Sequence, residues 1–339
     1  MNDAEAWLEV LTPGLLTTVQ DTLGRPHLAR YGVSTAGAMD PFAATAANAL
    51  VGNAPEAALL EITVVGPMLR FTQQATFALA GADLDAALDG QPIRPGWSCL
   101  ARAGATLGFG EPRSGARAYL ACAGGLDVPT VLGSRAADVR GGLSGFAGRA
   151  LRVGDRLRIH PAGDTASRSG RYLAATVNTD DPRLCVRVLP GPHLQHFHAD
   201  ALAELCAAEW TVTDQADRMG YRLTGPRLRH ADRADVPSLG LPLGSVQVPG
   251  DGQPIVLLAD HQPTGGYTVL ACVIRADISI LAQRGPGDTV RFACSTPLEA
   301  QAALRARYAE LRVVEPDTTA WAGLRWAESG GQAVALSGY

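Results

Sequence analysis

Three short motifs occur twice in the chain, in the same order in each half of the sequence. Each contains a Gly-Pro, Asp-Gly or Gly-Asp pair, and such pairs are common at turns, so β proteins can reuse one of them by chance. Three matches in one order favour an internal duplication and predict two halves of related fold. The matched segments are 66–70 with 225–229, 89–93 with 251–255, and 154–159 with 287–292.

The apolar runs are short and are separated by turn residues, among which the chain has 38 Gly and 22 Pro. This pattern is typical of an all-β barrel or sandwich. The clearest predicted strands are 10–19, 77–80, 118–121, 184–189 and 255–258. Few helices are expected: one begins after the N-cap Asp40, a second covers 199–208, and a third covers 297–311.

The duplication and the position of a linker-like segment divide the chain into three parts. Residues 162–170 are rich in Gly, Ser and Thr, as linkers are. We therefore expect an N-terminal β-barrel half at 1–165, a C-terminal half at 183–311, and a loosely held tail at 312–339.

The amino-acid composition argues against some classes of partner and cofactor. The net charge of −4 gives no reason to expect nucleic acid or an anionic membrane as a partner. There is no apolar run long enough for a membrane span and no apolar signal segment, so a cytoplasmic location is expected. All 29 basic residues are arginine. The chain therefore has no lysine to serve in a P-loop, to form a Schiff base or to carry biotin.

The six cysteines show no CxxC spacing, and we interpret them as free thiols in a reducing compartment. His193, His196 and His198 lie close together, but no nearby cysteine or carboxylate completes a familiar ligand pattern. We expect no metal site.

A group of polar residues follows the predicted strand 255–258. A carboxylate, an imidazole and several neutral hydrogen-bonding groups at one strand end could hold a small polar amide and move its protons, while paired glycines let the backbone approach a ligand. A turn that satisfies its own hydrogen bonds is the alternative. The candidate catalytic residues are Asp260, Gln262 and Tyr267, and the candidate substrate-binding residues are Thr264, Gly265 and Gly266.

Four more residues are candidates for substrate binding. Gln247 stands alone in an apolar strand, where it either contacts a ligand or faces outward. Arg218 and Arg222 flank a tyrosine and could bind a carboxylate or phosphate, although a surface ion pair is nearly as good an explanation. Asn48 lies inside a predicted helix, where asparagine is a poor choice unless it has a specific partner.

Segments spread along the chain form one further pattern: 20–25, 37–40, 47–53, 60–61, 119–121, 124–125, 132–135, 218–223, 244–249 and 264–267. Together these segments resemble the family of the 5-oxoprolinase C subunit, also called allophanate hydrolase subunit 2 or biotin-dependent carboxyltransferase-like. The resemblance extends over about residues 8–295. It departs from the family pattern at Ala136-Ala137-Asp138 and at Pro263.

This resemblance implies two related cyclophilin-like β-barrel halves with a few short helices. It also implies a complex with 5-oxoprolinase subunits A and B that opens 5-oxo-L-proline to L-glutamate at the expense of ATP, whose binding subunit the sequence does not identify. Two alternatives stay open: a carboxyltransferase domain that uses biotin carried elsewhere to act on urea or a similar amide, and a non-catalytic regulator of a kinase inhibitor.

Overall fold

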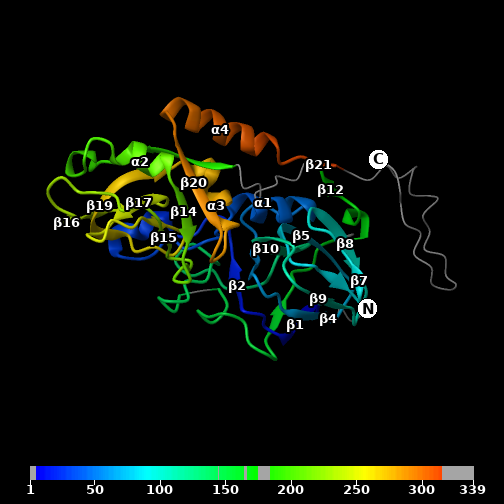
Figure 1. Ribbon diagram of the computed structural model, residues 1–339. Coiled ribbons are helices and arrows are strands. Elements are labelled where there is room, and N and C mark those ends of the chain that lie inside the picture. Colours follow the sequence, from blue (N-terminus) through cyan, green and yellow to red (C-terminus); the bar gives the residue numbers. More distant parts are fainter. Residues whose placement is uncertain (1–4, 144, 164–165, 175–183, 315–339) are drawn as a thin grey trace, which may run out of the picture.

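The computed structural model describes residues 5–143, 145–163, 166–174 and 184–314, in which strands outnumber helices (Figure 1). The prediction of a mainly β fold with a few short helices is confirmed. None of the helices in this part of the chain is long and apolar enough to cross a membrane.

Two sheets make up the N-terminal half. The smaller sheet has the strand order β11-β1-β4-β9-β6-β7, and the larger has the order β2-β3-β10-β5-β8-β12-β21. The strands of the smaller sheet are β1 (Trp7–Thr12), β4 (Met68–Phe71), β6 (Ala87–Leu88), β7 (Gln91–Pro92), β9 (Thr106–Gly108) and β11 (Arg156–Arg158). Those of the larger are β2 (Leu16–Gln20), β3 (Leu59–Thr63), β5 (Ala75–Asp83), β8 (Trp97–Ala101), β10 (Ser114–Cys122), β12 (Tyr172–Leu173) and β21 (Val313–Val314).

The single strand expected at 10–19 is in fact two strands in different sheets. Gly14, with φ +71°, makes the turn between β1 and β2. A Cβ at this position would lie 2.3 Å from the carbonyl oxygen of Val65, so the close approach of two backbones requires glycine. One apolar run thus supplies both layers of the N-terminal core.

The helix predicted after Asp40 is α1 (Pro41–Leu50), which covers the outer face of the larger sheet with its alanine-rich side. One carboxylate oxygen of Asp40, Oδ1, accepts hydrogen bonds from the backbone N–H groups of Phe42 and Ala43, at 3.1 and 3.0 Å. Asp40 is therefore the N-cap that the sequence indicated.

The C-terminal half closes on itself as a seven-stranded barrel in the order β13-β20-β14-β15-β18-β17-β19, because β19 also pairs with β13. A further strand, β16, extends from β19. The strands are β13 (Cys185–Pro190), β14 (Glu209–Val212), β15 (Gly220–Thr224), β16 (Asp235–Gly240), β17 (Ser245–Val248), β18 (Ile255–Leu257), β19 (Thr264–Val273) and β20 (Thr289–Cys294). A separate apolar core fills this barrel, and Met39 of the N-terminal half contributes to it.

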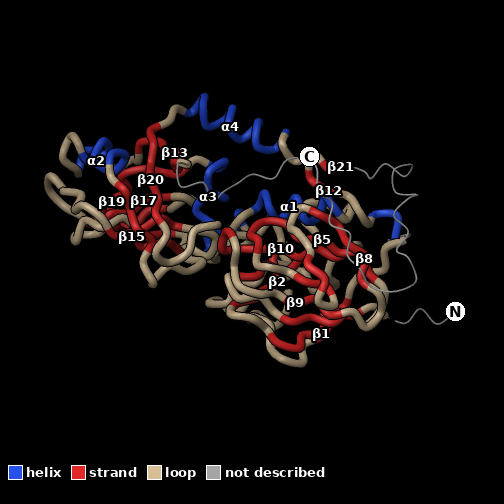
Figure 2. The backbone as a smooth tube through the Cα atoms, turned by 45° about the vertical axis from the view of Figure 1, so that its right-hand side comes forward, coloured by secondary structure: helices blue, strands red, loops and turns tan. Residues whose placement is uncertain are grey.

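The other α-helices belong to the C-terminal half. Helix α4 leaves the barrel and runs over the N-terminal half (Figure 2), where Tyr308 packs on Phe42 with ring centroids 4.7 Å apart. After α4 the chain returns to the larger N-terminal sheet through the pairing of β21 with β12. The helices are α2 (Ala201–Ala207), α3 (Ile278–Ala282), α4 (Pro297–Ala309), and the short 3₁₀ turns η1 (Pro26–Tyr31), η2 (Ala166–Arg168), η3 (Leu194–His196) and η4 (Arg275–Asp277).

The two apolar cores draw on residues on either side of the expected linker, with Met39 the exception. Residues 172–173, between the two expected halves, and residues 313–314 of the expected tail join the larger N-terminal sheet as β12 and β21. Residues 315–339 of the expected tail lie outside the described residues. The proposed division into three parts stays a prediction.

Candidate functional site

A buried guanidinium joins the two halves. Arg218 lies just before β15, and its Nε and Nη2 each donate to a carboxylate oxygen of Asp260 at 2.8 Å. Its Nη2 also donates to the carbonyl oxygen of Gly37 at 2.7 Å, and its Nη1 pairs with Glu61. The three charged side chains are at most 5% exposed. One arginine thus binds two carboxylates, one from each half.

The second oxygen of Glu61 continues this contact into the N-terminal half. Glu61 Oε2 accepts hydrogen bonds from the Met39 N–H and from the Tyr119 hydroxyl, both at 2.8 Å. The Tyr119 oxygen in turn accepts from the N–H of Asp40 at 2.7 Å. The start of α1 is therefore tied through Glu61 to Arg218 of the other half.

Asp40 also receives hydrogen bonds from the C-terminal half. Ser279 Oγ and Gln283 Nε2 donate to its two carboxylate oxygens at 2.6 and 2.9 Å. Gln283 Oε1 accepts from the N–H groups of Ala116 and Arg117, at 3.1 and 3.0 Å, where β10 bulges away from β5. We call this set of contacts, from Arg218 to Gln283, the seam.

Charges within the seam influence one another. Burial lowers the pKa of Arg218, but the adjacent Asp260 and Glu61 carboxylates outweigh it and raise that pKa above its ordinary value. Burial raises the pKa of Asp260, and the nearby Glu61 and Asp138 add to this, while Arg218 opposes it. Arg218 is therefore firmly cationic, and it is the group that keeps two buried carboxylates together.

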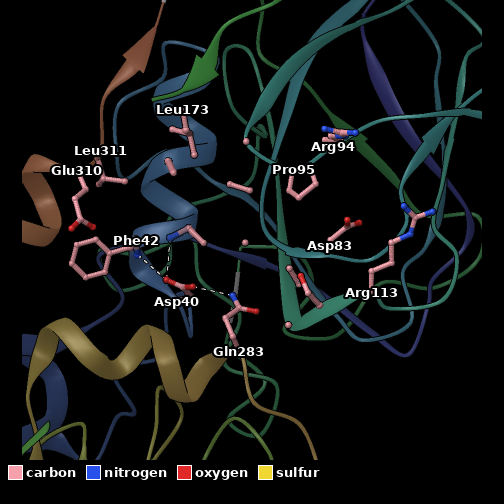
Figure 3. Close-up of a pocket in the computed structure, with 18 of the residues that line it drawn as sticks. Asp40, Phe42, Asp83, Arg94, Pro95, Arg113, Leu173, Gln283, Glu310 and Leu311 are labelled. Atoms are coloured by element: carbon pink, nitrogen blue, oxygen red, sulfur yellow. Dashed lines mark hydrogen bonds between the residues drawn. The ribbon is translucent and has the colours of Figure 1, made fainter. Parts of the chain in front are cut away.

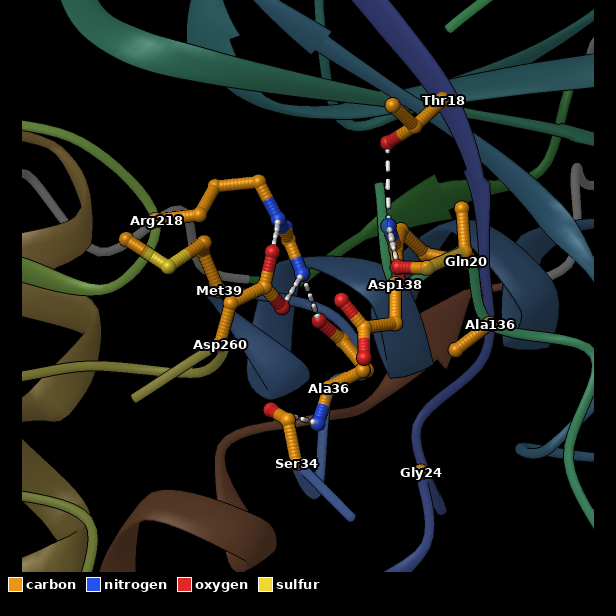
Figure 4. Close-up of polar contacts among 12 residues, drawn as sticks. Thr18, Gln20, Gly24, Ser34, Ala36, Met39, Ala136, Asp138, Arg218 and Asp260 are labelled. Carbon is orange, nitrogen blue, oxygen red and sulfur yellow. Dashed lines mark hydrogen bonds and ion pairs between the residues drawn. The ribbon is translucent and has the colours of Figure 1, made fainter. Parts of the chain in front are cut away.

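A second polar group lies beside the seam. Gln20 and Arg25 are at most 2% exposed, yet Gln20 Oε1 and Arg25 Nη1 have no hydrogen-bond partner among the described residues. Burial lowers the pKa of Arg25, and nearby carboxylates, among them Asp138 and Asp260, oppose this. Figure 4 shows Asp138 between Gln20 and the Arg218–Asp260 pair. Unpaired buried polar atoms are costly, so this corner has hydrogen-bonding capacity left for water or a ligand.

Two further candidates, Gln247 and Arg222, lie on barrel strands with their side chains on the outer face of the barrel. Register places Gln247 opposite Ile255 on one side and Val269 on the other, with Arg222 opposite Ile255 one strand further. Adjacent residues such as Val246 and Val256 fill the barrel interior, so these four side chains point outward. We call them, together with Gly265 and Gln262, the barrel face.

Gln247 is the distinctive residue of the barrel face. It is 1% exposed, and its Nε2 has no hydrogen-bond partner in the described part of the chain. A Cβ on Gly265 would lie 2.6 Å from Cδ1 of Leu241, 3.1 Å from this Nε2 and 3.5 Å from Nε2 of Gln262. Two side-chain amides and Leu241 therefore pack closely around Gly265.

The remaining predicted site residues lie apart from these two groups. Tyr267 is 43% exposed where β19 pairs with β16, opposite Asp235. Thr264 and Gly266 lie on the same strand, with Thr264 exposed. Asn48 is buried, and its Nδ2 donates to the carbonyl oxygens of Pro55 and Ala57. Its amide holds the loop after α1, which is the specific partner that its place in a helix required.

Two cavities flank the seam. One, of about 600 Å³, lies between α1, β5 and the end of α4 (Figure 3). Asp40 and Gln283 form part of its wall. The second, of about 330 Å³, is lined by residues of both halves, including Ala259, His261 and Pro263. Neither of these two cavities is lined by Asp260, Gln247 or Tyr267.

Sequence reasoning did not name the residues that complete the seam, or Arg25 beside it, as site candidates. Tyr119, Glu61, Asp40 and Arg25 lie in segments of the family resemblance but were given no role in a site, and Gln283 was not noticed. Their partners lie up to 243 positions away, as for Asp40 and Gln283. Arg25 alone carried a signal, since it sits in a polar turn after β2.

Comparison with known proteins shows which family has this architecture. The family model of the carboxyltransferase domain, subdomain A and B, matches residues 31–294. The 5-oxoprolinase C subunit of Escherichia coli (strain K12) is 40% identical over 310 residues, 91% of this chain and 96% of that protein. The protein of the same name from Haemophilus influenzae is 38% identical and covers 84% of this chain and 90% of that protein.

Larger proteins contain a similar unit. The urea amidolyase of Lachancea kluyveri is 31% identical, but the match spans 91% of this chain and only 18% of that protein. Among solved structures, K. lactis urea amidolyase superposes with a TM-score of 0.85 at 28% identity, covering 91% of this chain and 20% of that one. TTHA0988 superposes with a TM-score of 0.77 at 37% identity, covering 85% of this chain, which spans 56% of that protein.

The family model matches most of this chain, and the chain covers two related proteins almost completely. This chain therefore belongs to the carboxyltransferase domain A and B family, which includes the 5-oxoprolinase C subunit.

Proposed function

We propose that this chain is the C subunit of an ATP-dependent 5-oxoprolinase, acting in the cytoplasm. With partner subunits A and B it would open 5-oxo-L-proline to L-glutamate while ATP is hydrolysed. The observation that carries the proposal is the 40% identity to a 5-oxoprolinase C subunit along 96% of that protein. Because the chain contains no lysine, no P-loop lysine can come from it, and we assign ATP binding to a partner.

Within this chain, the barrel face is the part we assign to the substrate. The substrate carries a carboxylate and a ring amide. Arg222 is exposed and can pair with the carboxylate, and Gln247 Nε2 is a donor that can bind the ring carbonyl. These residues are two strands apart, about 9–10 Å along the sheet, a span that the arginine side chain and a small substrate can cover together.

Gln262 and Tyr267 keep the roles that their chemistry suggests, whereas Asp260 does not. The Gln262 amide lies on the same side of Gly265 as the Gln247 amide, so it can contact the same substrate. Tyr267 is exposed on β19 and Thr264 and Gly266 lie nearby on that strand, so they could meet a partner subunit at a shared site. Asp260 is occupied by Arg218, and we propose that it positions the two halves and does not touch the substrate.

Reconstitution tests the proposal. Purified subunits A and B are mixed with 5-oxoproline and ATP, with and without this chain, and glutamate is measured. Glutamate should form only when the chain is present. Equal glutamate formation without it would overturn the proposal.

A matched pair of variants tests the barrel face in the same assay. We expect Gln247→Met to lower kcat/KM at least about tenfold, the effect of losing one hydrogen bond of about 1.5 kcal/mol to a charged or strongly polar group. Gln215→Met is the control, because Gln215 is an exposed glutamine between β14 and β15. Similar losses in both variants would argue against substrate binding at Gln247.

The family model and the urea amidolyase matches support an alternative, a carboxyltransferase acting on urea or a similar amide. That reaction needs a biotinyl carrier, and without lysine this chain cannot be the carrier. Incubation with a carboxybiotin carrier and urea separates the two functions: carboxyl transfer to urea in the absence of 5-oxoproline would favour the alternative.

A non-catalytic regulatory role is tested by Asp260→Ala. The complex is reconstituted once with this variant and once with Gln247→Met. If both complexes assemble and keep full activity, neither residue serves the reaction. The chain would then act only by binding its partners.

A further inference from the structure

Two thiols touch on the outside of the barrel, away from the seam and the barrel face. Cys206 lies in α2 and Cys294 is the last residue of β20, 88 positions later, and their Sγ atoms are 3.4 Å apart. A disulfide bond has an S–S length of about 2.05 Å, so the sulfurs need to approach by only about 1.4 Å. Of the chain's six cysteines, this is the pair whose sulfur atoms are in contact among the described residues.

The two thiols differ in their surroundings. Cys294 is exposed, whereas Cys206 is partly buried. Burial raises the pKa of Cys206 to about 12, and the hydrogen bond and charge of Cys294 contribute to this increase. Cys294 is therefore the thiol that a solvent-borne oxidant meets first, and Cys206 is a protonated neighbour placed to react second.

We propose that Cys206 and Cys294 form an oxidation site, which a hydroperoxide converts to a reversible disulfide joining α2 to β20. The Cys294 thiolate attacks the peroxide, the O–O bond breaks, and Cys294 becomes a sulfenic acid as one oxygen leaves as hydroxide. The Cys206 sulfur then attacks the sulfenic sulfur and loses its proton, and water leaves. In total, two thiols and one hydrogen peroxide give one disulfide and two waters.

The position of the pair gives the disulfide a structural effect. Two residues after Cys294, Thr296 caps α4, and its capping box with Glu299 starts the helix that runs over the N-terminal half. A bond at Cys294 would fix the origin of α4 against α2 and close a loop of 88 residues. The oxidised chain should therefore unfold at a higher temperature than the reduced chain.

The experiment treats the full chain with a small excess of hydrogen peroxide, quenches it, and counts free thiols. We expect two fewer thiols per chain, the loss of two hydrogen atoms in the intact mass, and one cross-linked peptide pair containing Cys206 and Cys294. Reduction should restore the original mass and melting temperature.

Variants separate the two steps. Cys206→Ser should stop at a sulfenic acid on Cys294, which dimedone labels, and Cys294→Ser should show neither label nor disulfide. Cys185→Ser is the matched control, because Cys185 begins β13, the strand beside β20. This variant should leave the reaction unchanged. Retention of all thiols in the wild type, a disulfide involving Cys185, or cross-linking between chains would each overturn the proposal.

Discussion

The seam and the barrel face contain the same kinds of residue, arginine with glutamine and other polar groups, but they use them differently. In the seam, Arg218 and Gln283 have their hydrogen-bonding groups paired, with Asp260 in the case of Arg218 and with residues of the other half in both cases. On the barrel face, Gln247 keeps an amide nitrogen without a partner in the described part of the protein, and Arg222 is exposed.

The comparison separates polar residues that maintain the structure from those with capacity left for a ligand. A buried polar group that is fully paired stabilises one arrangement of the chain, whereas one that stays unpaired costs stability and needs another explanation. Burial alone therefore does not identify a binding residue, since Arg218 and Gln247 are both buried. The free hydrogen-bonding atoms distinguish them.

The strongest test of this distinction replaces one arginine from each region. Arg218→Ala leaves Asp260 and Glu61 as buried carboxylates without a cation, and we expect it to cost about 3–5 kcal/mol in the free energy of unfolding. Arg222→Ala removes an exposed side chain and should cost about 0.5 kcal/mol or less. Urea denaturation measures both, and equal losses would break the comparison.

A smaller effect is expected at the other end of the seam. Gln283→Ala removes the acceptor for two backbone N–H groups in the β10 bulge and one donor to Asp40. We expect a loss of about 1–3 kcal/mol, the cost of leaving buried polar groups unsatisfied. The same denaturation curves provide the measurement, with Gln215→Ala as the exposed control. A loss no greater than that of the control would mean that water replaces the glutamine.

The smallest effect on stability is expected for a substitution on the barrel face, which makes the difference from the seam clearer. Gln247→Met replaces a buried amide that has an unpaired nitrogen with an apolar side chain of similar size, so the free energy of unfolding should change by less than about 1 kcal/mol. The reconstituted activity should fall nevertheless. A large loss of stability would show instead that Gln247 maintains the barrel.

The sequence carried local features well. Asp40 predicted the start of α1, and the helix expected at 297–311 begins at Pro297, as α4 does, because helix starts depend on neighbouring residues. A lone glutamine in an apolar strand is also a local feature, and it made Gln247 a candidate. The mainly β fold followed from short apolar runs between turns.

Long-range pairings could not be obtained in this way. Arg218 meets Glu61 across 157 positions, and no local pattern specifies such a partner. The repeated turn motifs also predicted two similar halves without revealing how each closes. Gly154 and Gly287, at equivalent places in the repeat, share φ values of +86° and +89°, yet the strands after them enter an open sheet and a closed barrel respectively.

The carboxylate of Asp40 has consequences for how the chain loses its structure. It caps α1 within the N-terminal half and accepts from Ser279 and Gln283 of the other half at the same time. Separation of the halves would therefore weaken the first turn of a helix that is otherwise local. Heating should then melt both halves in one cooperative transition, despite their two distinct apolar cores.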